Sequence, residues 1–136
     1  MSEYQQPKPF LLRGDEDKRR AQRDKPKAHE RATAKSLGGR TTPASGALES
    51  NKGDVRDVEA GIFEFLIECK RTEGKSLRVE GAWLDKITRE AKRKLGRSPA
   101  LSLEFDQVRD AEARWVAVPE SVMKRMLEQL GEEVPW

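Results

Sequence analysis

Glu68 and Lys70 stand at the end of one of the few apolar runs in this sequence, IFEFLIECK at residues 62–70. Side chains alternate across a β-strand, so both charged groups would leave the same face of a strand. Placing them there is unfavourable unless they are paired, solvated or bound to a ligand. Glu-x-Lys occurs four times in the chain, but only this copy ends an apolar run. The pair is therefore either an ion pair on an edge strand or part of a cation site.

Asp54 offers a second carboxylate for a cation site. It lies in KGDV at the start of an expected short strand over residues 55–58, and Gly61 permits a turn into the next strand. If the two strands are antiparallel neighbours, Asp54 and Glu68 converge. Mg²⁺ binds oxygen ligands, usually one or two carboxylates together with phosphate and water. We therefore expect Mg²⁺ here, with Mn²⁺ as the alternative.

Hydrophobic patterning predicts the elements that must position these groups. Asp24 suits a helix N-cap and Pro26 a first helical turn, so the first helix is expected to begin there. The spacing of apolar residues in the rest of the chain predicts two later helices and five strands. The predicted helices cover residues 25–39, 82–96 and 119–131, and the predicted strands cover 40–42, 55–58, 62–69, 98–105 and 113–119. This order predicts an α/β domain with a mixed central β-sheet flanked by helices.

The charged N-terminal segment differs from the rest of the chain. Residues 1–24 carry charges of both signs, and their apolar residues show no regular spacing. We therefore expect a disordered or loosely helical tail over these residues, followed by one domain over 25–136. Basic residues exceed acidic ones by 27 to 24, giving a net charge of +3, which permits a polyanionic partner. One cysteine excludes an internal disulfide. Without a signal-peptide pattern or a bilayer-length apolar run, we expect a cytoplasmic protein with no membrane partner.

Four other residues that could bind or react have ordinary structural explanations, which are favoured. His29 is expected on the surface of a basic helix, and Cys69 is expected as a buried thiol on the apolar face of its strand. Trp115, within an apolar run, is expected in the core. Trp83 is the best candidate for stacking on a base, although core packing is favoured for it as well.

The segments HERATAKSLGGRTTPASGA, KGDV and FLIECK, in that order, resemble the PD-(D/E)xK nuclease superfamily, and most closely its archaeal-type Holliday junction resolvases. The resemblance covers about residues 26–105 and implies a restriction-endonuclease-like domain. Gly53 stands where the family has proline, and the segment from residue 106 is not matched. The positions that match the family's helix carboxylate, loop serine, motif aspartate and Glu-x-Lys are Glu30, Ser45, Asp54, Glu68 and Lys70.

This resemblance implies a metal-dependent DNA endonuclease, specifically a four-way junction resolvase that acts on branched DNA as a homodimer. Asp54, Glu68 and the Cys69 backbone carbonyl would hold the metal, which supplies Lewis acidity. Lys70 would orient the attacking water or stabilise the pentavalent charge. Glu30 would complete the ligand set, and Ser45 would join Lys70 and Glu30 among the catalytic residues.

Basic residues that flank this site in the sequence are expected to contact DNA phosphates, although a solvated face is the default explanation for such charges. They are Arg40, Lys52, Arg71, Lys75 and Arg78. Two alternatives to a resolvase stay open: another structure- or strand-selective endonuclease of the same superfamily, or a non-catalytic DNA-binding protein on this fold. A partner-binding adaptor that uses the charged tail has composition alone in its favour.

Overall fold

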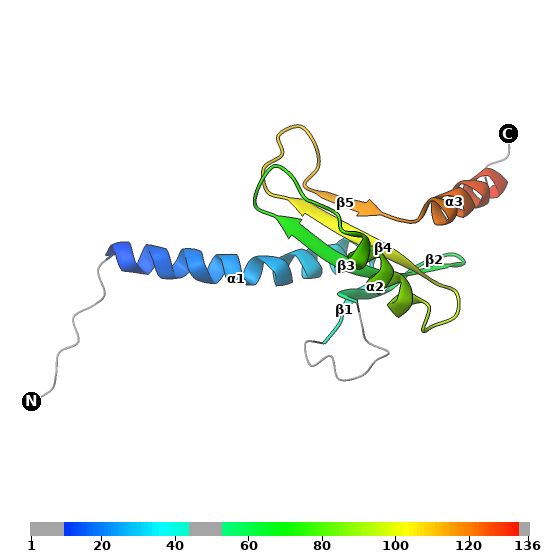
Figure 1. Cartoon of the computed structure of the whole chain (residues 1–136), viewed down its shortest axis with the longest axis horizontal. Helices are drawn as coiled ribbons and strands as arrows, with labels where there is room; N and C mark the ends of the chain where they lie inside the picture. The colour runs from blue at the N-terminus through cyan, green and yellow to red at the C-terminus, as the bar shows by residue number, and fades with distance from the viewer. Residues whose placement is uncertain (1–9, 44–52, 134–136) are drawn as a thin grey trace, which may run out of the picture.

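A computed structural model describes the chain over residues 10–43 and 53–133, with side chains from residue 24 onward (Figure 1). Within these ranges the chain forms three helices and five strands. In chain order they are α1 (Phe10–Leu37), β1 (Arg40–Thr41), β2 (Val55–Ala60), β3 (Phe63–Thr72), α2 (Gly81–Ala91), β4 (Arg97–Phe105), β5 (Arg114–Ala117) and α3 (Glu120–Glu133). None of the helices in the described ranges has the length and apolar character needed to cross a bilayer.

The five strands form one mixed sheet in the order β1-β2-β3-β4-β5. β3 and β4 are parallel and are connected through α2, whereas the other neighbouring strands are antiparallel. The predicted α/β class and mixed sheet are confirmed. The register between β2 and β3 shifts between Val55 and Val58, where Asp57 has a φ of 58°, so a bulge bends the strand that follows Asp54.

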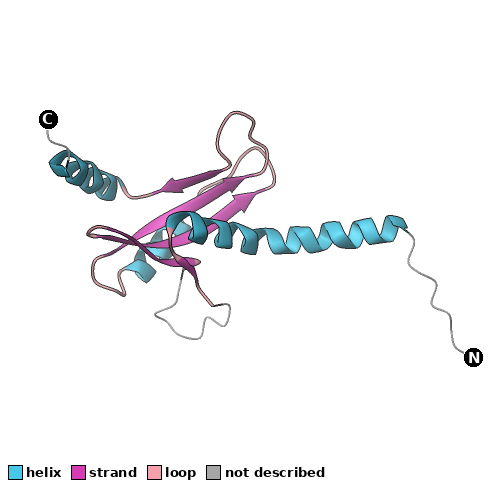
Figure 2. Cartoon of the chain, turned by 180° about the vertical axis from the view of Figure 1, so that it is seen from behind, coloured by secondary structure: helices cyan, strands magenta, loops and turns pink. Residues whose placement is uncertain are grey.

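The alternation of β3 divides the core between the two faces of the sheet. Phe63, Phe65 and Ile67 pack in the cluster on the α1 side, together with residues of β2 and α3. Leu66 packs on the other face against Ile87 of α2. Figures 1 and 2 show α2 and α1 on opposite sides of the sheet. The predicted division of this strand into two faces is therefore confirmed.

The first helix starts earlier than its expected N-cap at Asp24. α1 begins at Phe10 and continues through Pro26. Residues 15–23 are rich in good helix formers, and this propensity competes with the hydrogen bond that proline removes. With 28 residues, α1 is about 42 Å long. Its N-terminal half extends beyond the sheet (Figure 1).

Several apolar residues expected in the core lie at the surface. Trp115 lies on β5, an edge strand of the described sheet, and is 51% exposed. α2 ends at Ala91, so Leu95 falls beyond the helix and is almost fully exposed. Leu84 at the start of α2 is also exposed. Ile87 and Ala91 of α2 are buried, whereas Leu84 and Leu95, which share their helical spacing in the sequence, are not.

Candidate active site

Asp54 is held beside the interior of β3, which continues past Glu68 and Lys70 to Thr72, by two backbone hydrogen bonds. Its N–H donates to the Ile67 carbonyl at 2.8 Å, and its Oδ2 accepts from the Cys69 N–H at 2.7 Å. Gly53 immediately before it has a φ of +83°, and a Cβ at that position would lie 2.6 Å from Leu66 Cγ. Glycine is therefore required there, since it adopts this conformation freely and leaves room for the neighbouring side chain.

Glu68 is buried beside two ammonium groups. Its Oε1 lies 3.5 Å from Lys70 Nζ and 3.7 Å from Lys86 Nζ. Lys70 Nζ also lies 4.6 Å from the centre of the Trp83 ring, so the indole face adds a cation–π contact. Glu68 and Lys70 therefore form an ion pair, but the expected edge-strand setting is wrong, because β3 is the central strand of the described sheet and Glu68 is buried. Helix α2 contributes a second cation that the strand pattern alone did not indicate.

Lys86 is the residue of this site that sequence reasoning missed. The pattern of the 82–96 segment placed it on the polar face of a helix, where a solvated charge is the ordinary explanation. In the structure α2 lies across the face of the sheet that carries Glu68, which brings the Lys86 ammonium to within 3.7 Å of the Glu68 carboxylate. Lys86 is also 4.0 Å from Glu90, four residues later in the same helix, and that spacing was a visible signal of an ordered side chain.

Glu30 of α1 interacts electrostatically with both carboxylates of the predicted site. Burial raises the pKa of Glu30, and the charges of Asp54 and Glu68 raise it further, while Lys27 and Arg31 oppose the shift. Burial also raises the pKa of Asp54, against the hydrogen bond from Cys69, and the charge of Glu68 adds to the rise. The carboxylates of Glu30 on α1, of Asp54 before β2 and of Glu68 on β3 therefore influence one another electrostatically.

A metal ion would relieve this repulsion, and the oxygen donors have the chemistry that Mg²⁺ selects. Asp54 and Glu68 are therefore suited in kind to hold it. Among the residues that the structure describes, however, no group of three or more His, Cys, Asp or Glu side chains is arranged to bind a metal ion. Cys69 does not add a thiolate, because burial raises the pKa of its thiol to about 12. Its side chain packs against the apolar cluster, as expected.

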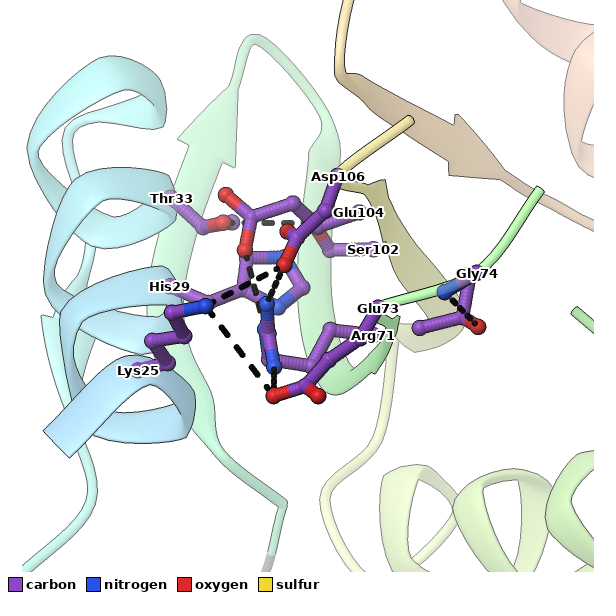
Figure 3. Close-up of polar contacts among 10 residues, drawn as sticks. Lys25, His29, Thr33, Arg71, Glu73, Gly74, Ser102, Glu104 and Asp106 are labelled. Carbon is purple, nitrogen blue, oxygen red and sulfur yellow. Dashed lines mark hydrogen bonds and ion pairs between the residues drawn. The ribbon is translucent and has the colours of Figure 1, made fainter. Parts of the chain in front are cut away.

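The predicted DNA contacts are placed in different surroundings. Arg40, Lys75 and Arg78 are exposed, on β1 and on the loop between β3 and α2. Arg71 instead leaves β3 on the α1 side, opposite to Lys70, and its side chain is 12% exposed. Its guanidinium contacts the carboxylates of Glu73, Glu104 and Asp106 (Figure 3). Ser45 and Lys52 lie outside the described residues.

The expected surface position of His29 is wrong. The side chain is 2% exposed, and Nε2 shares a hydrogen bond of 3.0 Å with Ser102 Oγ, which also lies 3.1 Å from Thr33 Oγ1 (Figure 3). The reason is that α1 packs this side against the sheet at β4. Burial lowers the pKa of His29, while the nearby charge of Glu104 opposes the shift. His29 therefore belongs to the packing between α1 and β4, away from Lys70.

No protein-family model, curated protein or solved structure matched this chain. Functional inference therefore depends on the arrangement of Glu30, Asp54, Glu68, Lys70 and Lys86.

Proposed function

We propose that this protein is a metal-dependent endonuclease that hydrolyses phosphodiester bonds in branched DNA, with the four-way junction as its substrate and a restriction-endonuclease-like fold. One observation carries the proposal: Asp54 is hydrogen-bonded to the backbone beside Glu68, while Lys70 pairs with Glu68. The antiparallel pairing of β2 and β3 supports the convergence that the sequence predicted. Glu30 adds a third carboxylate from α1.

Each of these residues has a distinct role in the proposed reaction. Asp54 and Glu68 would hold Mg²⁺, which when bound supplies the Lewis-acid chemistry of phosphodiester hydrolysis. Lys70 would stabilise negative charge that develops on the scissile phosphate, and the Trp83 ring restricts where its ammonium can lie. Glu30, whose pKa is raised, is suited to accept a proton from the attacking water.

Recognition would follow the shape of the DNA rather than its sequence. Arg40, Lys75 and Arg78 are exposed cations, and contacts from such groups to the phosphate backbone carry no direct sequence information. Paired incision across a junction needs two active sites, and one chain carries one set of these residues, so we include a homodimer in the proposal.

The test compares cleavage of a four-way junction, a linear duplex, a single strand and a flap, with and without Mg²⁺, at equal phosphate concentration. We expect Mg²⁺-dependent cleavage of the junction, which Asp54→Asn or Glu68→Gln reduces on the order of 10³-fold or more. Glu64→Gln is the matched control. Glu64 lies on the same strand but pairs with Lys94 at 2.7 Å, and its loss should leave cleavage unchanged.

Equal cleavage of duplex and junction would replace the resolvase with a general endonuclease. A second candidate is a non-catalytic DNA-binding protein, which is favoured by the lack of a three-residue metal group among the described residues. Tight, salt-sensitive junction binding without cleavage in Mg²⁺ or Mn²⁺ would establish that candidate. Absence of both binding and cleavage would overturn the DNA-directed proposal altogether.

A further inference from the structure

A groove of about 460 Å³ lies where β4 and β5 run side by side. The described residues that line it are apolar apart from one ammonium group, and they include Leu103, Phe105, Val108, Trp115, Ala117 and the exposed Lys75. The other charged residues of the two loops beside it, 73–80 and 106–113, carry both signs and do not line it. A groove of this size accommodates a small aromatic ligand.

The register of the sheet places this groove beside Lys70. Lys70 of β3 is paired with Leu103 of β4, and Leu103 is paired with Trp115 of β5. Leu103 packs against the cluster of Leu66 and Ile87, so this row of side chains lies on the α2 face of the sheet. Neighbouring strands are about 4.8 Å apart, which puts the backbone of Trp115 about 10 Å from that of Lys70. The groove therefore continues the face that carries the proposed active site.

Trp115 presents an aromatic surface in this groove that is already held in place. Its indole Nε1–H donates to the Glu112 carbonyl at 2.9 Å, and the residue is 51% exposed. Trp83, the best candidate for stacking in the sequence, instead has Lys70 Nζ 4.6 Å from the centre of its ring. A ring that is held before binding loses little conformational entropy when a ligand stacks on it. Trp115 is therefore better suited than Trp83 to stack on a planar ligand.

The two loops beside the groove are joined to each other. Gln107 Nε2, in the loop between β4 and β5, donates to the Glu73 carbonyl in the loop between β3 and α2 at 2.9 Å. Figure 1 shows both loops at the same end of the sheet. The first loop carries Val108 and the second carries Lys75, so this hydrogen bond helps to fix an apolar side chain and a cation on the same groove.

An unpaired nucleotide matches this combination of groups. Every base has a π-face, so an aromatic side chain stacks on any of them, and a nearby cation pairs with the phosphate of the backbone. In a linear duplex the bases stay stacked inside the helix, whereas a branch point or a single-stranded arm exposes them. Since Lys75 is the one charge among the described residues of the groove, no carboxylate in that lining opposes the phosphate.

We propose that the groove between β4 and β5 is a base-binding subsite, in which an unpaired base of the DNA strand stacks on Trp115 while Lys75 contacts the adjoining phosphate. The inference rests on the proposed DNA-directed function. It adds to that function a feature of the substrate, namely an unpaired base at the branch, close to the phosphate that Lys70 would contact.

Equilibrium binding of the full chain in EDTA to two branched DNAs tests the subsite without cleavage. One DNA carries a single unpaired deoxyadenosine at the branch point, and the other carries an abasic residue at the same position. We expect the wild type to bind the first about tenfold more tightly, which lies within the range for stacking of one base on an aromatic side chain. This comparison does not depend on the folding of any variant.

Trp115→Ala should bind both DNAs with the same, weaker affinity, because it has lost the stacking surface. Trp115→Phe keeps an aromatic ring and should retain most of the preference for the base, with an unchanged circular dichroism spectrum. Leu127→Ala is the matched control and should retain the full preference, since Leu127 is an apolar residue of α3, 60% exposed, that does not line the groove.

Lys75→Ala separates the phosphate contact from stacking. It should weaken binding to both DNAs equally, keep the tenfold preference for the base, and lower the log–log salt slope by about one. An unchanged salt slope would overturn the part of the proposal that concerns Lys75.

Equal affinity of the wild type for the two DNAs, or a tenfold preference that survives in Trp115→Ala, would overturn the base-binding subsite and leave the proposed endonuclease standing. Absence of binding to either DNA would overturn both proposals. The two failures therefore give different results in the same measurement.

Discussion

Lys70 and Arg71 are adjacent cations on β3, and the structure gives them opposite surroundings. Lys70 lies on the α2 side, 3.5 Å from Glu68 and over the Trp83 ring. Arg71 lies on the α1 side, where three carboxylates surround its guanidinium and Lys25 pairs with two of the same carboxylates. One neighbour belongs to the proposed site, and the other belongs to a network that ties α1 to the ends of β3 and β4 (Figure 3).

Proximity to Glu68 in the sequence therefore does not place a cation in the same site. Alternation along the strand sends residues 68 and 70 to one face and residue 71 to the other. Contact of Arg71 with DNA phosphates remains a prediction, but a guanidinium that already has three carboxylate partners gains less from a phosphate than an exposed one. Arg40, Lys75 and Arg78 are exposed and better placed for that role.

Replacing each of the two cations by alanine should separate their functions, and the larger effect is expected at Lys70. Lys70→Ala should reduce cleavage of a four-way junction about 10²- to 10³-fold, because the positive charge beside the proposed phosphate position is lost. Junction affinity measured without divalent metal should change far less. The measurement is single-turnover cleavage in Mg²⁺ at saturating protein. Wild-type cleavage by this variant would remove Lys70 from the mechanism.

Arg71→Ala should act on stability instead. The substitution removes the guanidinium that pairs with Glu73, Glu104 and Asp106, and we expect a loss of about 2 kcal/mol in the free energy of unfolding. Urea denaturation measures the loss. Cleavage per folded molecule should stay near the wild-type value. A stable variant that binds DNA with a reduced salt slope would instead assign Arg71 to phosphate contact.

The pH dependence of stability should reveal His29. Burial lowers its pKa below the ordinary value of 6.5, so below that pH the unfolded chain binds a proton that the folded chain does not. The free energy of unfolding should therefore fall as the pH drops from about 7 towards the folded pKa, at less than about 1.4 kcal/mol per pH unit. Glu104, Arg114 and Arg71 also act on this histidine.

His29→Gln keeps a polar partner for Ser102 and should remove that part of the pH dependence. The check is chemical denaturation of both proteins between pH 7.5 and about 5. Identical pH profiles would mean that His29 titrates equally in the folded and unfolded chains, which contradicts its buried position.

The smallest expected effect is a gain in stability at the proposed metal site. The raised pKa of Asp54 means that the unfolding free energy decreases as the pH rises through 3.8 towards the folded pKa. At neutral pH and without metal, Asp54→Asn should remove this cost, while its side-chain oxygen can still accept from the Cys69 N–H. We expect a rise of about 2 °C in Tm by calorimetry.

Added Mg²⁺ should raise the Tm of the wild type and leave that of Asp54→Asn almost unchanged, because an ion that binds the folded state stabilises it. Equal stabilisation of both proteins would place the ion elsewhere. This measurement does not depend on cleavage, so it tests the metal site even if the chain is a non-catalytic DNA-binding protein.

Local periodicity and the connections between neighbouring elements were enough to predict part of this fold. Alternation placed Phe63, Phe65 and Ile67 on one face of β3 and Leu66 with Glu68 on the other. The short turn at Gly61 made β2 and β3 antiparallel neighbours, and the order of helices and strands predicted a mixed sheet. Each of these features follows from residues that are close together in the chain.

Contacts between side chains of different helices and strands could not be predicted in this way, because they depend on how those elements pack together. Burial of His29 depends on α1 packing against β4, 73 residues later in the chain, and the approach of Lys86 to Glu68 depends on where α2 crosses the sheet. Trp115 of β5 and Leu127 and Leu130 of α3 are exposed although they belong to apolar segments. The spacing of apolar residues shows that a face can be buried, but it does not identify what buries that face. The same limit applies to Arg71, whose three carboxylate partners come from the loop after β3, from β4 and from the residue after β4.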